Sequence, residues 1–204
     1  MSSKFRKLFT ITFVLFLLGS PLFSEARCSH VLITDFRNVN LFEAFYSYDK
    51  NKKEFEFTPI TEATYKRLSV ENKIIYKKVK KSDSLYKKSQ SHLPEALKIA
   101  YLQRAYGTNC YNLPAANALV NHFEKNKKYS TALYYALQVK KYDTKNKYPD
   151  IDYKIGNLYY SLGYTDESLI YFEKAQKSLN KTKNNPELLK EVSQKIKSLN
   201  KTGK

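Results

Sequence analysis

The chain has 204 residues, 42% of them hydrophobic, and a formal net charge of +17 at pH 7. This length is enough for one domain with a buried core plus a targeting segment, and no part of it indicates a second independent domain. A positive excess attracts polyanions, but an AT-rich coding sequence also yields many lysines, asparagines and tyrosines, so we interpret the charge mainly as solvated surface.

The first 26 residues have the parts of a secretory signal peptide. A positive start and an apolar run at 8–18 are followed by the small residues Ser24 and Ala26. The run is about half of the ~20 residues that a spanning helix needs, and the small residues have the spacing of a cleavage site. We expect cleavage after Ala26 and export to the periplasm or cell envelope, or secretion, where nucleic acid is no routine partner. An uncleaved N-terminal anchor is the alternative.

Two cysteines, Cys28 and Cys110, remain after such processing. Lipid attachment at Cys28 is not expected, because Arg27 and Glu25 differ from the small and aliphatic residues that bacterial lipoproteins carry there. In an oxidising compartment the two cysteines could form a disulfide that holds the N-terminal segment near the turn before Tyr111. Two free thiols are the alternative.

Between residues 28 and 57 the pattern is mixed. Asn40 with Glu43 resembles a capping box that opens a short helix through Tyr48, whereas "KEFEFT" alternates as a strand does. The prediction here is a short helix with irregular flanks.

Prolines and apolar spacing predict helices along the rest of the chain. A proline is well tolerated in the first turn of a helix, and Thr58 and Asn185 precede two of the prolines as capping residues would. Gly107 and Gly163 each follow a predicted helix and are expected to end its last turn. The helix-starting prolines are Pro59, Pro94, Pro114, Pro149 and Pro186. The predicted helices are 59–67, 70–90, 94–106, 114–126, 129–142, 150–162, 166–179 and 186–199.

The helical region is self-similar at a spacing of 36 residues, the distance from Ala132 to Ser168. A further step of the same length back from Ala132 reaches Ala96, so about three helix pairs are expected. The other corresponding residues are Leu119 with Ile155, Phe123 with Tyr159, and Val139 with Ala175.

Residues 150–183 resemble a tetratricopeptide repeat. Ile155-Gly156 and Tyr159 match the leucine-glycine and tyrosine of that family's first helix, and Ser168, Phe172 and Ala175 match the alanine, aromatic and alanine of its second. Asp152 and Ser168 depart from the usual tryptophan and alanine. The unit at 114–147 matches more loosely, with Val120 in place of the glycine and Ala136 in place of the aromatic residue.

The resemblance implies an all-α fold, a right-handed α-solenoid of about three helix pairs with a C-terminal capping helix. Gly156, Ser168, Ala132 and Ala175 would be small where paired helices cross, and Tyr159 and Phe172 would fill the space toward the next pair. The expected divisions are a signal peptide at 1–26, an N-terminal extension at 27–69, helical repeats at 70–183, and a capping helix and tail at 184–204.

No motif indicates an enzyme. The three histidines, His30, His92 and His122, are scattered, and the sequence has no phosphate-binding glycine loop or nucleophile elbow. Cys28 and His30 are close in sequence, but a solvated N-terminus explains them better than a metal site. We therefore expect no catalytic residues, metal or cofactor.

Tetratricopeptide arrays bind peptides or protein segments in a concave groove lined by the first helix of each pair. The resemblance places Asn117, Asn121, Lys125, Tyr153, Lys154, Asn157 and Tyr160 on that face. Asn121, Lys154 and Asn157 resemble part of a clamp for a C-terminal carboxylate, but an ordinary polar surface is the preferred interpretation. The expected function is thus an exported protein-interaction module of the bacterial cell envelope. The alternative is a basic envelope structural protein that associates peripherally with anionic lipid or polymer, and the oligomeric state stays open.

Overall fold

The computed structural model describes residues 46–49, 54–143, 146–182 and 185–202. The predicted signal peptide at 1–26, Cys28, and the capping box of Asn40 and Glu43 lie outside these residues. The described elements are the strands β1 (Tyr46–Asp49) and β2 (Glu54–Phe57) and the helices α3 (Glu62–Arg67), α4 (Val70–Ser89), α5 (Glu95–Thr108), α6 (Leu113–Lys125), α7 (Tyr129–Tyr142), α8 (Ile151–Ser161), α9 (Thr165–Thr182) and α10 (Pro186–Thr202).

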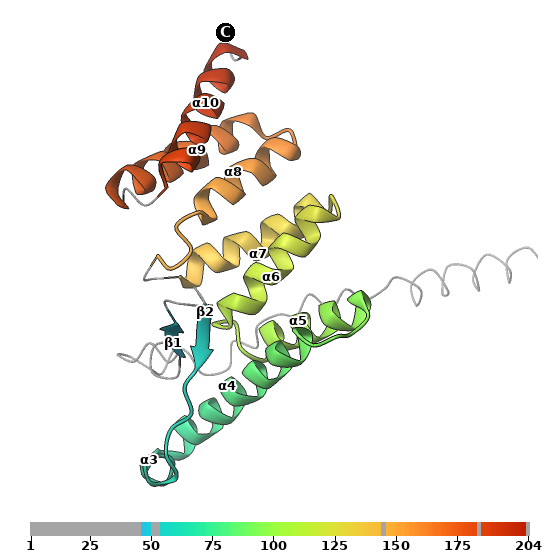
Figure 1. Cartoon of the computed structure of the whole chain (residues 1–204), viewed down its shortest axis with the longest axis vertical. Helices are drawn as coiled ribbons and strands as arrows, with labels where there is room; N and C mark the ends of the chain where they lie inside the picture. Colours follow the sequence, from blue (N-terminus) through green and yellow to red (C-terminus); the bar gives the residue numbers. More distant parts are fainter. Residues whose placement is uncertain (1–45, 50–53, 144–145, 183–184, 203–204) are drawn as a thin grey trace, which may run out of the picture.

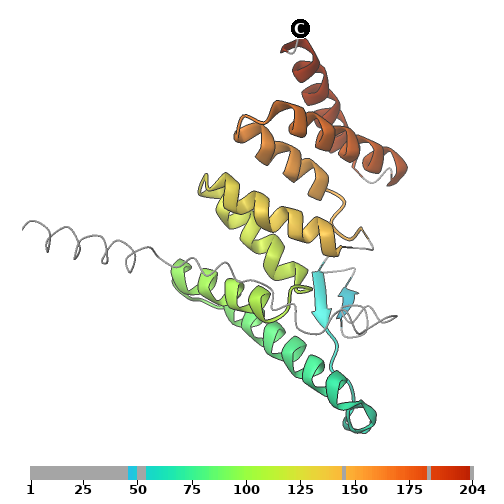
Figure 2. The same cartoon turned by 180° about the vertical axis from the view of Figure 1, so that it is seen from behind.

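Helices that follow one another in the chain also lie side by side in space. The most extensive contacts are within the hairpins α4/α5, α6/α7 and α8/α9, and α10 packs on α9. Figures 1 and 2 show these elements succeeding one another along the long axis of the molecule, with the β1/β2 hairpin beside the start of α6. Apart from this small hairpin, the described fold is helical, as the sequence predicts.

Three groups of buried side chains hold these elements together. The largest extends from α4 to α8 and includes the fully buried Leu119, Ala132 and Ile155. A second joins the end of β2 at Phe57 to α4 and to the start of α6. The third, built around Phe172, joins α9 to α10. The apolar side of α10, with Val192 and Leu199 buried, therefore packs against α9.

The predicted helix positions are confirmed to within a few residues, with three local corrections. Tyr46–Asp49 pairs antiparallel with Glu54–Phe57, so the helix predicted through Tyr48 is wrong and the alternating pattern was the better guide. The first helix begins at Glu62 with Thr61 as its capping residue, not after Thr58. Gly107 lies inside α5 and does not end it.

The close crossing predicted at Gly156 is present in the α8/α9 hairpin. The Ser168 hydroxyl donates a hydrogen bond to the Gly156 carbonyl oxygen over 2.9 Å. A Cβ atom at Gly156 would come within 2.8 Å of ring carbons of Phe172. Ala175 of α9 is also fully buried. Small side chains therefore permit the backbones of α8 and α9 to approach each other closely.

The two aromatic residues predicted to fill the same space face different neighbours. Phe172 is buried toward α10, as expected for a residue that packs on the next element. Tyr159 instead stacks on Tyr171 with a centroid distance of 5.5 Å and packs against the core formed by α4 to α8. The prediction is therefore right for Phe172 and wrong for the direction of Tyr159.

Asp152, in the position where the resemblance expects tryptophan, is buried and forms an ion pair with a partly exposed lysine. Its Oδ2 lies 2.7 Å from Nζ of Lys140 on α7. Oδ1 of the same carboxylate has no hydrogen-bond partner in the described part of the chain. A charge at this depth needs its counterion, so Lys140 and Asp152 link the second hairpin to the third.

A buried polar network joins α4, α5 and the start of α6. Asn112 caps α6 by accepting a hydrogen bond from the Ala115 N–H, and its amide donates to the Ser82 hydroxyl over 2.8 Å. Ser82 in turn donates to the Ala105 carbonyl oxygen over 2.7 Å. Each polar atom in this chain of contacts is paired, which offsets the cost of burying it.

Two helices end in the same left-handed turn but with different residues. After α8, Gly163 has φ +82°, its N–H donates to Tyr160 O, and the Tyr164 N–H donates to Tyr159 O. After α6, Lys127 occupies the equivalent position with φ 56°. Glycine adopts this conformation at little cost, whereas a residue with a Cβ atom is strained there.

We therefore expect Lys127→Gly to raise the free energy of unfolding by about 1 kcal/mol and Gly163→Ala to lower it by a similar amount. Chemical denaturation monitored by circular dichroism measures both. Lys128→Gly is the matched control, because Lys128 has φ −87° and gains nothing from glycine. Equal effects of the two lysine substitutions would contradict the assignment of strain to Lys127.

Candidate functional site

Side chains predicted to face a groove come together between α6 and α8. The Lys154 ammonium group on α8 reaches across to α6, where it lies 3.0 Å from Asn121 Oδ1 and 3.3 Å from Asn117 Oδ1. It is also 3.4 Å from Asp150 Oδ2, one helical turn earlier. An ammonium group has three N–H donors, so three acceptors surround this one within the protein.

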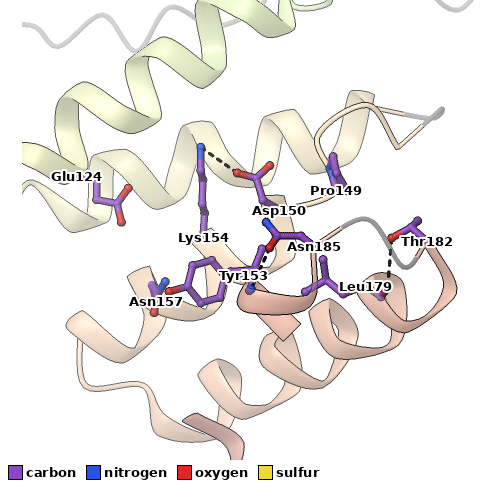
Figure 3. Close-up of a pocket in the computed structure, with 10 residues that line it drawn as sticks. Glu124, Pro149, Asp150, Tyr153, Lys154, Asn157, Leu179, Thr182 and Asn185 are labelled. Carbon is purple, nitrogen blue, oxygen red and sulfur yellow. Dashed lines mark hydrogen bonds and ion pairs between the residues drawn. The ribbon is translucent and has the colours of Figure 1, made fainter. Parts of the chain in front are cut away.

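A pocket of about 500 Å³ opens beside this lysine. Figure 3 shows its lining side chains, which come from the end of α6, the first turns of α8, the end of α9 and the start of α10. They are Glu124, Pro149, Asp150, Tyr153, Lys154, Asn157, Leu179, Thr182, Asn185 and Leu188. Residues far apart in the sequence therefore form one concave site.

Tyr153 links the pocket to α10. Its hydroxyl donates a hydrogen bond to the carboxylate of Glu191, and its ring packs near that of Phe172. Burial is the main reason that the pKa of Tyr153 is raised, and the hydrogen bond with Glu191 and the negative charges of Glu191 and Glu124 raise it further. The hydroxyl is thus in a negative local field.

The remaining wall is formed by helix ends. Asn185 is occupied as the capping residue of α10, because its Oδ1 accepts the Leu188 N–H over 3.0 Å, as the sequence predicts. Leu179 and Leu188 bring apolar surface next to it. The pocket consequently combines an apolar side with carboxylates and one neutralised lysine.

The residues predicted for the groove do not all reach the pocket. Tyr153, Lys154 and Asn157 line it. Asn117 and Asn121 stand behind Lys154 as its hydrogen-bond acceptors. The other two lie outside it. Lys125 is exposed at the end of α6, and Tyr160, 55% exposed, lies 5.8 Å from the Lys195 ammonium group on α10.

Sequence reasoning missed the acidic members of the site and its wall from α9 and α10. Asp150 could have been found, because it precedes Lys154 by four residues, the spacing of a helical ion pair. Glu124, Leu179 and Leu188 carry no comparable signal, since they lie on α6, α9 and α10 and only the packing of these helices brings them to the pocket beside α8.

His122 and Cys110, both outside the pocket, have structural contacts. His122 Nδ1 lies 2.8 Å from Glu95 Oε1 and links α6 to α5. Cys110 is buried and disulfide-bonded, while the chain's other cysteine, Cys28, lies outside the described residues. Within the described ranges, no three His, Cys, Asp or Glu side chains gather as a metal site would require. No described helix has the length and apolar character needed to cross a membrane.

No family model fits this sequence, and no curated protein is significantly similar to it.

Proposed function

We propose that this chain is an exported, tetratricopeptide-like protein-interaction module of the bacterial cell envelope, a right-handed solenoid of three helix pairs closed by α10. It binds a peptide or protein segment along the face formed by α6 and α8. The succession of α4/α5, α6/α7 and α8/α9 in space, each a hairpin of neighbouring helices, supports the repeat architecture.

The observation that carries the proposal is the meeting of α6 and α8 side chains at a pocket. Asn117, Asn121 and Lys154 form a hydrogen-bonded group across the two helices, and Tyr153 and Asn157 continue it into the pocket. Amide and aromatic groups of this kind suit a peptide, because they offer both hydrogen bonds and contact area. The pocket gives the face a place to anchor a side chain.

Replacing Asn121, Asn157 and Tyr160 together by alanine is expected to abolish capture of partner proteins, since it removes two amides and an exposed aromatic ring from this face. The measurement is a pull-down from envelope extract, with circular dichroism to verify that helix content is unchanged. The control replaces Glu173, Lys177 and Asn180 on the exposed side of α9. Capture unaffected by the first triple variant would move the binding surface elsewhere.

A second candidate function, peripheral association with anionic lipid or polymer, is favoured by the exposed side of α4. Lysines lie along it together with the exposed apolar residues Val70 and Ile74. Salt separates the two functions: adhesion by charge collapses as ionic strength rises, whereas recognition in the pocket largely persists. The exposed lysines of this helix are Lys77, Lys80, Lys81, Lys87 and Lys88.

A further inference from the structure

The described residues that line the pocket between α6, α8 and α10 carry a net charge opposite to that of the protein as a whole. The chain carries a formal +17, yet among the described residues the charged groups that line the pocket are two carboxylates, Glu124 and Asp150, and one ammonium group, Lys154. A third carboxylate, Glu191, is bonded to the Tyr153 hydroxyl at its edge. A ligand in the pocket therefore meets a local negative excess.

Lys154, the one cation among the described residues that line the pocket, is already neutralised. Lys154 faces Asp150 and the amide oxygens of Asn117 and Asn121. A carboxylate ligand would have to displace one of these acceptors and lie near Glu124, which places like charges together. The clamp for a C-terminal carboxylate is thus not favoured by this arrangement.

Glu124 is a carboxylate of the pocket that can accept hydrogen bonds from a ligand. Among the described residues its carboxylate makes no ion pair, although it lines the pocket and contributes to the negative field at Tyr153. An ionised carboxylate accepts hydrogen bonds and donates none. Its natural complement is an N–H donor that carries positive charge.

The apolar wall suits the rest of a basic side chain. Leu179, Leu188 and Pro149 lie in the same lining as the carboxylates, and lysine and arginine bury their methylene stems on apolar surface while the charged end seeks polar groups. The ring of Tyr153 adds an aromatic surface that attracts cations. A volume of about 500 Å³ accommodates such a side chain.

We infer that the pocket binds a lysine or arginine side chain of the peptide held between α6 and α8, with Glu124 and Asp150 as its acceptors and Leu179 and Leu188 against its stem. This inference rests on the proposed peptide-binding function and names the chemistry of its anchor.

The test is affinity selection on the full-length chain from a library of N-acetylated, C-terminally amidated random heptapeptides at about physiological salt. Blocking both termini removes the terminal ammonium and carboxylate groups as ligands. A protein with this net charge attracts acidic peptides non-specifically, so enrichment of lysine or arginine at one position has to come from a local site. That enrichment is the expected result.

The selected peptide is then labelled and its affinity measured by fluorescence anisotropy. Replacing its basic residue by norleucine, and replacing Glu124 by Gln in the protein, should each weaken binding about three- to tenfold. Glu124→Lys should invert the preference toward an acidic residue at that position. Glu173→Gln, on the exposed side of α9 and outside the pocket, is the control and should leave the affinity unchanged.

The other outcomes separate this inference from the function on which it rests. Enriched peptides with an acidic or apolar anchor would overturn the inference and leave peptide binding standing. Enrichment of basic peptides that Glu124→Lys does not disturb would also overturn it, because the basic residue would then bind outside the pocket. Failure to enrich any peptide would contradict the proposed function itself.

Discussion

Phe172→Ala is expected to lower the free energy of unfolding by about 3–5 kcal/mol. The ring is almost completely buried, it packs with Val192 and Leu199 of α10, and it lies against Gly156 of α8. Truncation therefore removes contacts with two neighbouring helices and leaves a cavity between them. Urea denaturation followed by circular dichroism measures the loss.

The contact between Phe172 and Gly156 allows a second, related test. Gly156→Leu alone should cost about 1–3 kcal/mol, because its added atoms would meet the Phe172 ring. In the double variant the ring is absent, so the combined cost should be smaller than the sum of the two single costs. Ser161→Leu, at an exposed position of the same helix, is the control for the leucine substitution. Strictly additive costs would contradict the close crossing of α8 and α9.

Lys140→Met is expected to lower the free energy of unfolding by about 2 kcal/mol, below the usual cost of breaking a fully buried pair, because the lysine is partly exposed. The substitution leaves Asp152 buried without a counterion. One oxygen of that carboxylate already has no hydrogen-bond partner in the described part of the chain. Thermal and urea denaturation both report the effect.

The relative stabilities of two further variants distinguish the effect of an unpaired buried charge from that of lost packing. Asp152→Leu should cost less than Lys140→Met, because it leaves only a half-exposed lysine that water can solvate. The double variant, with methionine and leucine facing each other, should recover most of the stability. Lys177→Met, at an exposed site on α9, controls for the lysine change. If the double variant were the least stable of the three, the ion pair would be a net stabiliser, contrary to this expectation.

The helices were predictable because their signals are local. Proline positions, apolar residues three and four apart, and Gly163 are all read within a few neighbouring residues. The strand Tyr46–Asp49 was not predictable in this way, because its conformation depends on pairing with β2 across the hairpin. A nearby capping pattern suggested a helix instead. Thr61, which caps α3, was overlooked because Pro59 gave the stronger apparent start.

The site was predictable only as far as the resemblance to a repeat family reaches. That resemblance places Tyr153, Lys154 and Asn157 on one face of α8, and they do line the pocket. That Lys154 is already paired depends on the distance between α6 and α8, which no local pattern contains. Asp152 is a similar case: the sequence shows only that it departs from the usual tryptophan, whereas its partner Lys140 lies on another helix.

The sequential contacts of the helices also have a kinetic consequence. Because each helix from α4 onward packs mainly on its neighbours in the chain, few native contacts require distant segments to find one another, and chains of low contact order fold quickly. The nucleus can form at any hairpin and grow toward either end. Transient opening should begin at α10, which among the described helices packs mainly on α9 and would detach with the core of α4 to α8 still closed.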